Sequence, residues 1–147
     1  MTRHEKVVLL VEDTPDDEKL ALRALRKHRV GHRVVVVRDG AEALDWLFRR
    51  GAHGNRDPAV HPQVVILDLN LPKIGGLEVL RAMRADPRTQ RLPVVVLTSS
   101  KEDRDLLESY QRGANSYVCK PVEFNEFMEA VSKLGIYWVL VNEVPRD

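Results

Sequence analysis

The fold of this chain is constrained most by four short apolar runs, each of which is followed directly by polar residues. The runs, with the residues that follow them, are VVLLV (7–11; Glu12 and Asp13), VVIL (64–67; Asp68), VVVL (94–97; Thr98) and YVC (117–119; Lys120). Short runs rich in β-branched and aliphatic residues are typical of buried strands. In an open parallel sheet, ligands bind beyond the carboxyl ends of the strands. The pattern therefore predicts one pocket in which acids, a hydroxyl and an ammonium group meet.

The segments between these runs have helical periodicity, which favours an α/β protein with a parallel sheet. A further run, RVVVVR at 33–38, supplies the remaining strand. Because the runs are apolar throughout, we expect helices on both faces of the sheet. The first helix is expected to begin at Pro15, with Thr14 as its cap. The other helices are expected at 41–50, 76–85, 101–112 and after Pro121, with a polar loop at 51–62.

The acids at the ends of the runs suit a divalent cation and a phosphoryl group. Mg²⁺ prefers oxygen ligands and typically takes one or two carboxylates together with phosphate oxygens and waters. Glu12, Asp13 and Asp68 offer such ligands. Asp68 follows the middle run and is the predicted nucleophile, which would form an acyl phosphate once Mg²⁺ offsets the repulsion between the two anions. Lys120 is expected to pair with the phosphoryl charge, and Thr98 to donate a hydrogen bond to it.

Each of these residues also has an ordinary structural interpretation. Glu12 and Asp13 place negative charge near the start of a helix, where such charge is stabilising. Asp68 could be a turn residue, and Lys120 a solvated lysine. The functional interpretation depends on their coincidence, because chance does not readily place such residues at the ends of all four apolar runs.

Composition restricts the class of protein. The chain has 147 residues, which predicts a single domain over 1–147 with no space for an output domain. Charged residues form 31% of the chain but nearly cancel, giving a formal net charge of +1. This balance predicts neither a nucleic-acid partner nor a membrane anchor. The single cysteine, Cys119, cannot form an internal disulfide, and the N-terminus lacks a signal peptide, so we expect a cytoplasmic protein.

Four motifs, in their order and spacing, resemble the receiver domains of two-component response regulators. The motifs are VEDTPDD, ILDLNLPKIGG, VVVLTSS and GANSYVCKP. The resemblance covers nearly the whole chain. It implies a flavodoxin-like, doubly wound α/β fold with five helices and a five-stranded parallel sheet in the order 2-1-3-4-5. It also implies a switch protein rather than an enzyme, which accepts a phosphoryl group from a phosphohistidine on a sensor histidine kinase.

The resemblance assigns roles to individual residues. It implies that Mg²⁺ is coordinated by Asp13, by the phosphoacceptor Asp68 and by the backbone carbonyl of Asn70, with Glu12 acting mainly through water. It further implies that Lys120 contacts the phosphoryl group.

Two further pairs of residues follow from the same resemblance. Thr98 and Tyr117 match the family's switch pair, in which the hydroxyl moves toward the phosphoryl group and the aromatic ring turns into the space that it leaves. Asn70 and Ser100 lie at positions that tune the lifetime of the acyl phosphate in this family.

The end of the chain predicts a homodimer. After Gly135 the run IYWVLV (136–141) is apolar on every side. If the last helix continues, Tyr137, Leu140 and Val144 form a second apolar stripe that another surface must cover. Alternatively, the helix breaks at Gly135 and the tail folds back over its own domain. This tail and the loop at 51–62 resemble a subgroup of regulators that pair with phytochrome-type histidine kinases and dimerise through the last helix.

Three other functions remain open at this point. A relay intermediate would pass the phosphoryl group on to a histidine phosphotransfer protein. An aspartyl-phosphate hydrolase uses the same kind of nucleophile, but it usually has a second aspartate at the position of Asn70. A flavin-binding module on the same topology would need a phosphate-binding loop after the first strand, where Glu12 and Asp13 stand instead.

Overall fold

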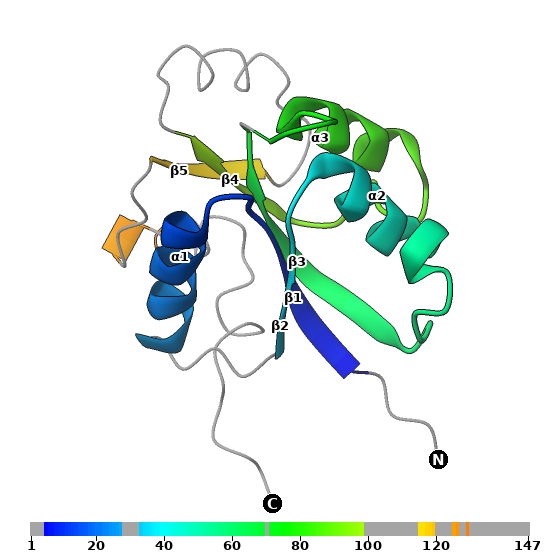
Figure 1. Ribbon diagram of the computed structural model, residues 1–147, viewed down its shortest axis with the longest axis horizontal. Helices are drawn as coiled ribbons and strands as arrows, with labels where there is room; N and C mark the ends of the chain where they lie inside the picture. Colours follow the sequence, from blue (N-terminus) through cyan, green and yellow to red (C-terminus); the bar gives the residue numbers. More distant parts are fainter. Residues whose placement is uncertain are drawn as a thin grey trace, which may run out of the picture.

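A computed structural model describes residues 5–27, 33–69, 71–98, 115–119, 125, 126 and 129. Its centre is a five-stranded sheet with the strand order β2-β1-β3-β4-β5 (Figure 1). The strands are β1 (Glu5–Val11), β2 (Arg33–Val37), β3 (Val60–Asp68), β4 (Val94–Thr98) and β5 (Asn115–Cys119). Every pair of neighbouring strands is parallel. The parallel sheet and its strand order are as predicted.

Helices cover both faces of this sheet. In Figure 1, α1 (Pro15–Lys27) lies on one side, and α2 (Gly40–Phe48) and α3 (Gly76–Ala85) lie together on the other. The expected starts at Pro15 and at residue 76 are confirmed, and α2 ends at Phe48, earlier than the predicted residue 50. Of the remaining predicted helices, 101–112 lies outside the described residues. The helix after Pro121 is described only at Asn125, Glu126 and Glu129, which are helical.

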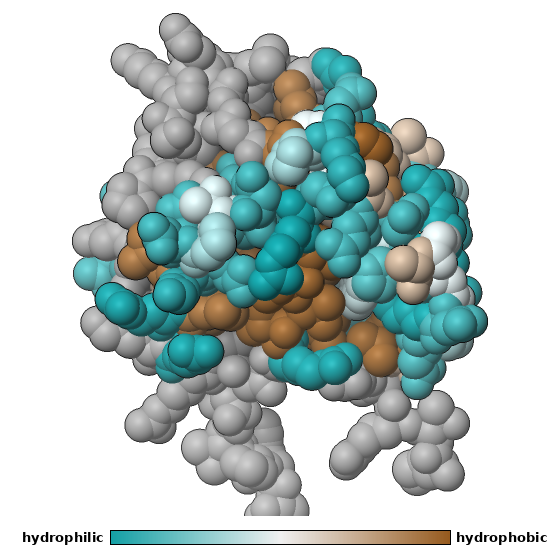
Figure 2. Space-filling model, viewed as in Figure 1, coloured by the Kyte–Doolittle hydropathy of each residue, from teal (hydrophilic) through white to brown (hydrophobic). Residues whose placement is uncertain are grey.

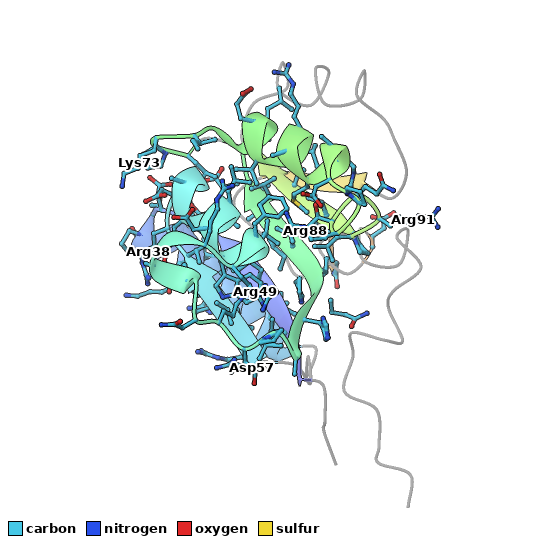
Figure 3. All side chains as sticks on the ribbon, turned by 90° about the vertical axis from the view of Figure 1, so that its right-hand side faces the viewer. Arg38, Arg49, Asp57, Lys73, Arg88 and Arg91 are labelled. Carbon is cyan, nitrogen blue, oxygen red and sulfur yellow. The ribbon has the colours of Figure 1, made fainter. Side chains whose placement is uncertain are left out.

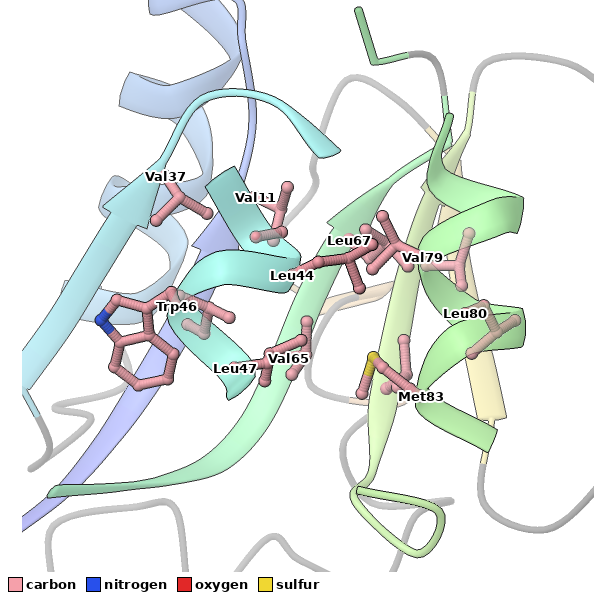
Figure 4. Packing of buried hydrophobic residues seen from close by; sticks show 14 of the residues in the cluster. Val11, Val37, Leu44, Trp46, Leu47, Val65, Leu67, Val79, Leu80 and Met83 are labelled. Carbon is pink, nitrogen blue, oxygen red and sulfur yellow. The ribbon is translucent and has the colours of Figure 1, made fainter. Parts of the chain in front are cut away.

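The core is divided between the two faces by the alternation of side chains along each strand. One cluster joins Val7, Leu9 and Val11 of β1 to the apolar sides of α2 and α3 (Figure 4). Val8 and Leu10 are equally buried but point to the opposite face, which α1 covers. The strands are apolar throughout, and the sequence therefore predicted that both faces of the sheet are buried. The structure confirms this prediction.

The segment between α2 and β3 differs from the predicted loop at 51–62. A short 3₁₀ helix occupies Gly51–His53, and β3 already begins at Val60. Arg56 fixes this segment: its Nε donates to the carbonyl of Trp46 at 2.8 Å, and its Nη1 donates to the carbonyl of Val60 at 2.6 Å. Its guanidinium also lies 4.0 Å from the centre of the Trp46 ring. These contacts tie the end of α2 to the start of β3, and burial lowers the pKa of Arg56.

The surface of the described residues is mixed. In the view of Figure 2, a hydrophobic area lies where Figure 1 shows β1 and β2, and hydrophilic residues surround it. In the edge strand β2, Val34, Val35 and Val36 are half-buried. Within the described part of the chain, no helix is long and apolar enough to cross a membrane.

Candidate functional site

The ends of two neighbouring strands bring three acids together. Glu12 and Asp13 follow β1, and Asp68 is the last residue of β3. In the register of these strands Val11 pairs with Leu67, so the next step places Glu12 opposite Asp68. Neighbouring strands lie about 4.7–4.9 Å apart, which brings side chains from the two strand ends within reach of one metal ion.

Backbone hydrogen bonds fix both strand ends. The Glu12 N–H donates to the carbonyl of Val37 in β2 at 3.0 Å, and the Leu69 N–H donates to the carbonyl of Leu97 in β4 at 3.1 Å. The main chain is thus held on both sides of the acids. The Thr14 N–H donates to Oε2 of Glu12 at 3.3 Å, which orients that carboxylate just before α1 begins.

The three carboxylates form a compact acidic cluster, defined as Glu12, Asp13 and Asp68. One oxygen from each lies within 4.8 Å of the others. Glu12 is 0% and Asp68 1% exposed, whereas Asp13 faces solvent. Two opposite ligands of an octahedral Mg²⁺ are about 4.2 Å apart, because each Mg–O bond is about 2.1 Å. Separations within 4.8 Å are therefore compatible with three oxygens around one small divalent cation, and the exposed Asp13 leaves that side of the cluster open to solvent.

The buried members of this cluster make a cation energetically favourable. Burying an ionised carboxylate is costly unless a cation or hydrogen bonds compensate it. In the acidic cluster, the buried carboxylates of Glu12 and Asp68 lie close to each other and to the exposed carboxylate of Asp13. A bound cation would offset their mutual repulsion and turn the acidic cluster into a site for an anionic ligand.

The other predicted site residues are only partly described. Thr98 ends β4 and Tyr117 lies in the neighbouring β5, where the backbone pairs Val96 with Tyr117. The side chains of Thr98 and Tyr117 lie outside what the structure describes. The same holds for the whole of Asn70, Ser100 and Lys120, and for the predicted dimer residues Tyr137, Leu140 and Val144.

The sequence interpretation missed the close packing of two glycines, of which Gly76 lies against the backbone of Asp68. A Cβ added to Gly76, the first residue of α3, would overlap the carbonyl oxygen of Asp68 and lie 2.6 Å from Cα of Leu69. A Cβ added to Gly40, the first residue of α2, would overlap the carbonyl oxygen of Ile74. Glycine is a poor helix former. A glycine at the first position of a helix can therefore indicate that neighbouring atoms leave no room for a side chain there.

Comparison with known proteins identifies the family. Residues 8–132 match the model of the response regulator receiver domain. The chain belongs to this family. Receiver domains act mainly as phosphorylation-dependent switches: they are phosphorylated on an aspartate, bind Mg²⁺ or Mn²⁺ at an acidic site and interact with sensor histidine kinases.

Several similar proteins are named as response regulators of phytochromes. Two solved structures, the bacteriophytochrome response regulators AtBRR and RtBRR, have 49% and 47% identity and TM-scores of 0.84 and 0.86. Each comparison covers 97% of this chain, together with 100% of AtBRR and 85% of RtBRR. Response regulator Rcp1 from Synechocystis sp. is 34% identical over 95% of this chain and 93% of its own length. A solved structure of Rcp1 is the Mn(2+)-bound form, with a TM-score of 0.73 over 96% of this chain and 99% of that one.

Proposed function

We propose that this protein is a response regulator that accepts a phosphoryl group on Asp68, with Mg²⁺ held at the acidic cluster. The observation that carries the proposal is the approach of the three carboxylate oxygens to within 4.8 Å of one another at the ends of β1 and β3. Membership of the receiver family and the Mn(2+)-bound form of Rcp1 support it. Asp68 is the natural acceptor because it ends the central strand β3 beside both other acids.

Each residue of the site has its own role in the proposed phosphoryl transfer. Asp13 and Asp68, with the backbone carbonyl of Asn70, would hold the cation, and Glu12 would act through its water shell. When bound, the cation screens the charge on the phosphoryl oxygens so that a carboxylate can approach them. Asp68 then attacks phosphorus, and the bond to the donor nitrogen breaks as the acyl phosphate forms. Within this proposal, Asn70 and Ser100 set how fast water removes the group.

Three further residues complete the proposed switch. Lys120 pairs with the phosphoryl charge as a point cation. Thr98 donates a hydrogen bond to a phosphoryl oxygen, and Tyr117 on the neighbouring strand turns inward in response. The pairing of β4 with β5 supports this part of the proposal, because it brings the backbones of the two switch residues onto adjacent strands.

The proposed donor is a phytochrome-type sensor histidine kinase. This follows from the names of the relatives, two of which are bacteriophytochrome response regulators with nearly half of their residues identical to this chain. A kinase partner and a lone cysteine fit a cytoplasmic protein. A relay intermediate that passes the group to a histidine phosphotransfer protein uses the same site, and labelled phosphate leaving Asp68 for such a protein would establish it.

Incubation with acetyl phosphate and Mg²⁺, followed by intact-mass measurement, tests the acceptor. We expect the wild type to gain one phosphoryl group and the Asp68→Asn variant to gain none. Asp57→Asn is the matched control: Asp57 is an exposed aspartate away from the acidic cluster, and an asparagine oxygen can still accept from the Ala59 N–H, now at 2.9 Å. A phosphoryl group on Asp68→Asn, or uptake by the wild type that survives chelation of the metal, would refute the proposal.

We also propose that the protein forms a homodimer through its last helix. The support is the apolar stripe of Tyr137, Leu140 and Val144 in the sequence, which needs a covering surface. Tyr137→Glu and Leu140→Glu should each yield a monomer in analytical ultracentrifugation, with unchanged phosphoryl uptake from acetyl phosphate. A wild type that sediments as a monomer would end this proposal.

A further inference from the structure

The loop that joins Asp68 to α3 is held between the first residues of two helices. This β3–α3 loop comprises residues 69–75, of which all but 70 are described. At one end, the Gly76 N–H donates to the carbonyl of Leu69 at 3.0 Å. Gly76 also lies so close to the main chain of Asp68 that a side chain would not fit. The start of α3 is therefore packed directly against the backbone of the acceptor.

The other side of the loop is packed against α2. A Cβ on Gly40 would overlap the Ile74 carbonyl oxygen and lie 2.7 Å from its carbonyl carbon and 2.9 Å from its Cβ. Beside this contact, Nζ of Lys73 lies 3.5 Å from Oδ2 of Asp39, while Oδ1 of the same aspartate caps α2 by accepting from the Glu42 N–H at 2.7 Å. Figure 3 shows Lys73 and Arg38 toward the end of the molecule where α2 begins, and Arg49 and Asp57 toward the other.

Of the two partners in this contact, the loop is less buried than α2. α2 is anchored by Ala43, Leu44, Trp46 and Leu47, all of which are buried in the core. Its last carbonyls are bound by Arg56. The loop has no comparable burial: Lys73 is exposed, with a left-handed φ of 68°, and Ile74 is only half-buried. A side chain at position 40 would therefore displace Ile74 rather than α2.

We propose that Gly40 is a positioning residue for the metal site, acting through the β3–α3 loop. The inference rests on the proposed function, because it concerns the cation at the acidic cluster. Gly40 and Gly76 hold the loop from its two sides, so a displacement at Ile74 reaches Leu69 and Asp68 through the packed start of α3. The first turn of α2 is thereby coupled to the geometry of the acidic cluster, although none of its side chains ligates the cation.

Binding of Mn²⁺ alone, measured by the electron paramagnetic resonance signal of the free ion, tests this inference. We expect Gly40→Ala to weaken Mn²⁺ binding about 10-fold, the lower end of what substitutions behind metal ligands cause. Gly75→Ala is the matched control, because a Cβ there has nothing within 4 Å and its φ of −67° suits alanine. It should bind Mn²⁺ as the wild type does. Urea unfolding without metal is measured alongside, since a purely structural role would lower stability but leave the affinity of the folded protein unchanged.

Each outcome decides between the two proposals. Equal Mn²⁺ affinity for Gly40→Ala and Gly75→Ala, with a wild type that binds, would overturn the role of Gly40 and leave the proposed function intact. A wild type that does not bind Mn²⁺ would overturn the proposed function itself.

If Gly40→Ala does not fold, the inference is tested by hydrogen exchange of the wild type instead of by Mn²⁺ binding to the variant. The Glu42 and Ala43 amides should exchange more slowly when Mn²⁺ is bound, because coupling between two sites is reciprocal. Unchanged exchange at both amides would overturn the inference.

Discussion

Removal of one negative charge from the acidic cluster should stabilise the metal-free protein while it weakens metal binding. We choose Asp13→Asn, because Asp13 is the exposed member and asparagine has nearly its size. At 4.8 Å, the upper limit of the separation between the oxygens of the acidic cluster, two charges repel by about 0.9 kcal/mol in water and by about 3.5 kcal/mol at an effective dielectric constant of 20. Because Asp13 is exposed to solvent, we use the repulsion energy in water for each pair of charges. Repulsion of Asp13 from Glu12 and Asp68 together then amounts to about 1.8 kcal/mol. The nearby start of α1 attracts Asp13 by about 0.3–1 kcal/mol, so we expect a net gain of about 1 kcal/mol.

The assay is urea unfolding followed by circular dichroism, first with a chelator and then with increasing Mg²⁺. Without metal, Asp13→Asn should have the higher free energy of unfolding. With Mg²⁺ at about 100 times its dissociation constant, the wild type should gain about 2.7 kcal/mol, whereas the variant gains much less. The order of stability should therefore reverse as the metal concentration rises.

Asp16→Asn serves as the control for this experiment. It removes the same charge from the first turn of α1, where negative charge is favourable, so it should lower stability by about 0.3–1 kcal/mol without metal. It should still gain stability from Mg²⁺. A lower stability of Asp13→Asn in the chelator, or a gain from Mg²⁺ as large as that of the wild type, would contradict this prediction.

Three further predictions concern residues outside the acidic cluster. Arg56→Ala should lower the free energy of unfolding by about 2–4 kcal/mol, because it removes charged hydrogen bonds to backbone carbonyls and the contact with the Trp46 ring; a loss below about 0.5 kcal/mol in urea unfolding would contradict this. Arg49→Gly should raise the free energy of unfolding by about 0.5–1 kcal/mol, because Arg49 caps the end of α2 with a φ of 53°, a conformation that glycine adopts without strain; a lower urea midpoint would contradict this. Hydrogen bonds from the side chain and backbone of Arg88 lower the pKa of Asp86 to about 2, so its stabilising effect is present above pH 3.8 and is lost only as the pH falls through about 2. A carbon-detected NMR titration should show this value and its rise in Arg88→Gln, and a midpoint near 3.8 in the wild type would refute it.

The strands and the place of the site could be predicted from the sequence because each depends on a local pattern. Buried parallel strands need apolar residues on both faces, so 7–11, 64–67 and 94–97 indicated the sheet directly. Parallel strands end at one edge, which placed Asp68 beside the acids at 12 and 13. The extent of α3 followed from the helical spacing of Leu77, Leu80 and Met83 and from Asp86-Pro87, which stops a helix.

Other features depend on contacts that no local pattern contains. The early start of β3 was hidden by Pro62, since proline inside a central strand removes a ladder hydrogen bond. The structure accommodates it at an irregularity, where Val7 pairs with Pro62 but Val8 pairs with Val64. The role of Gly40 was hidden because its partner Ile74 lies on a distant part of the chain. The complete burial of Glu12 likewise results from packing, as a charged residue after a strand is usually solvated.

Arg56 binds both ends of the connection between α2 and β3, so the length of this connection does not set the position of Asp68 at the end of β3. The chain enters the central strand at a point that Arg56 fixes through the carbonyls of Trp46 and Val60. The exposed turn at Gly54 and Asn55 can therefore take insertions, including a fluorescent reporter, without moving Asp68.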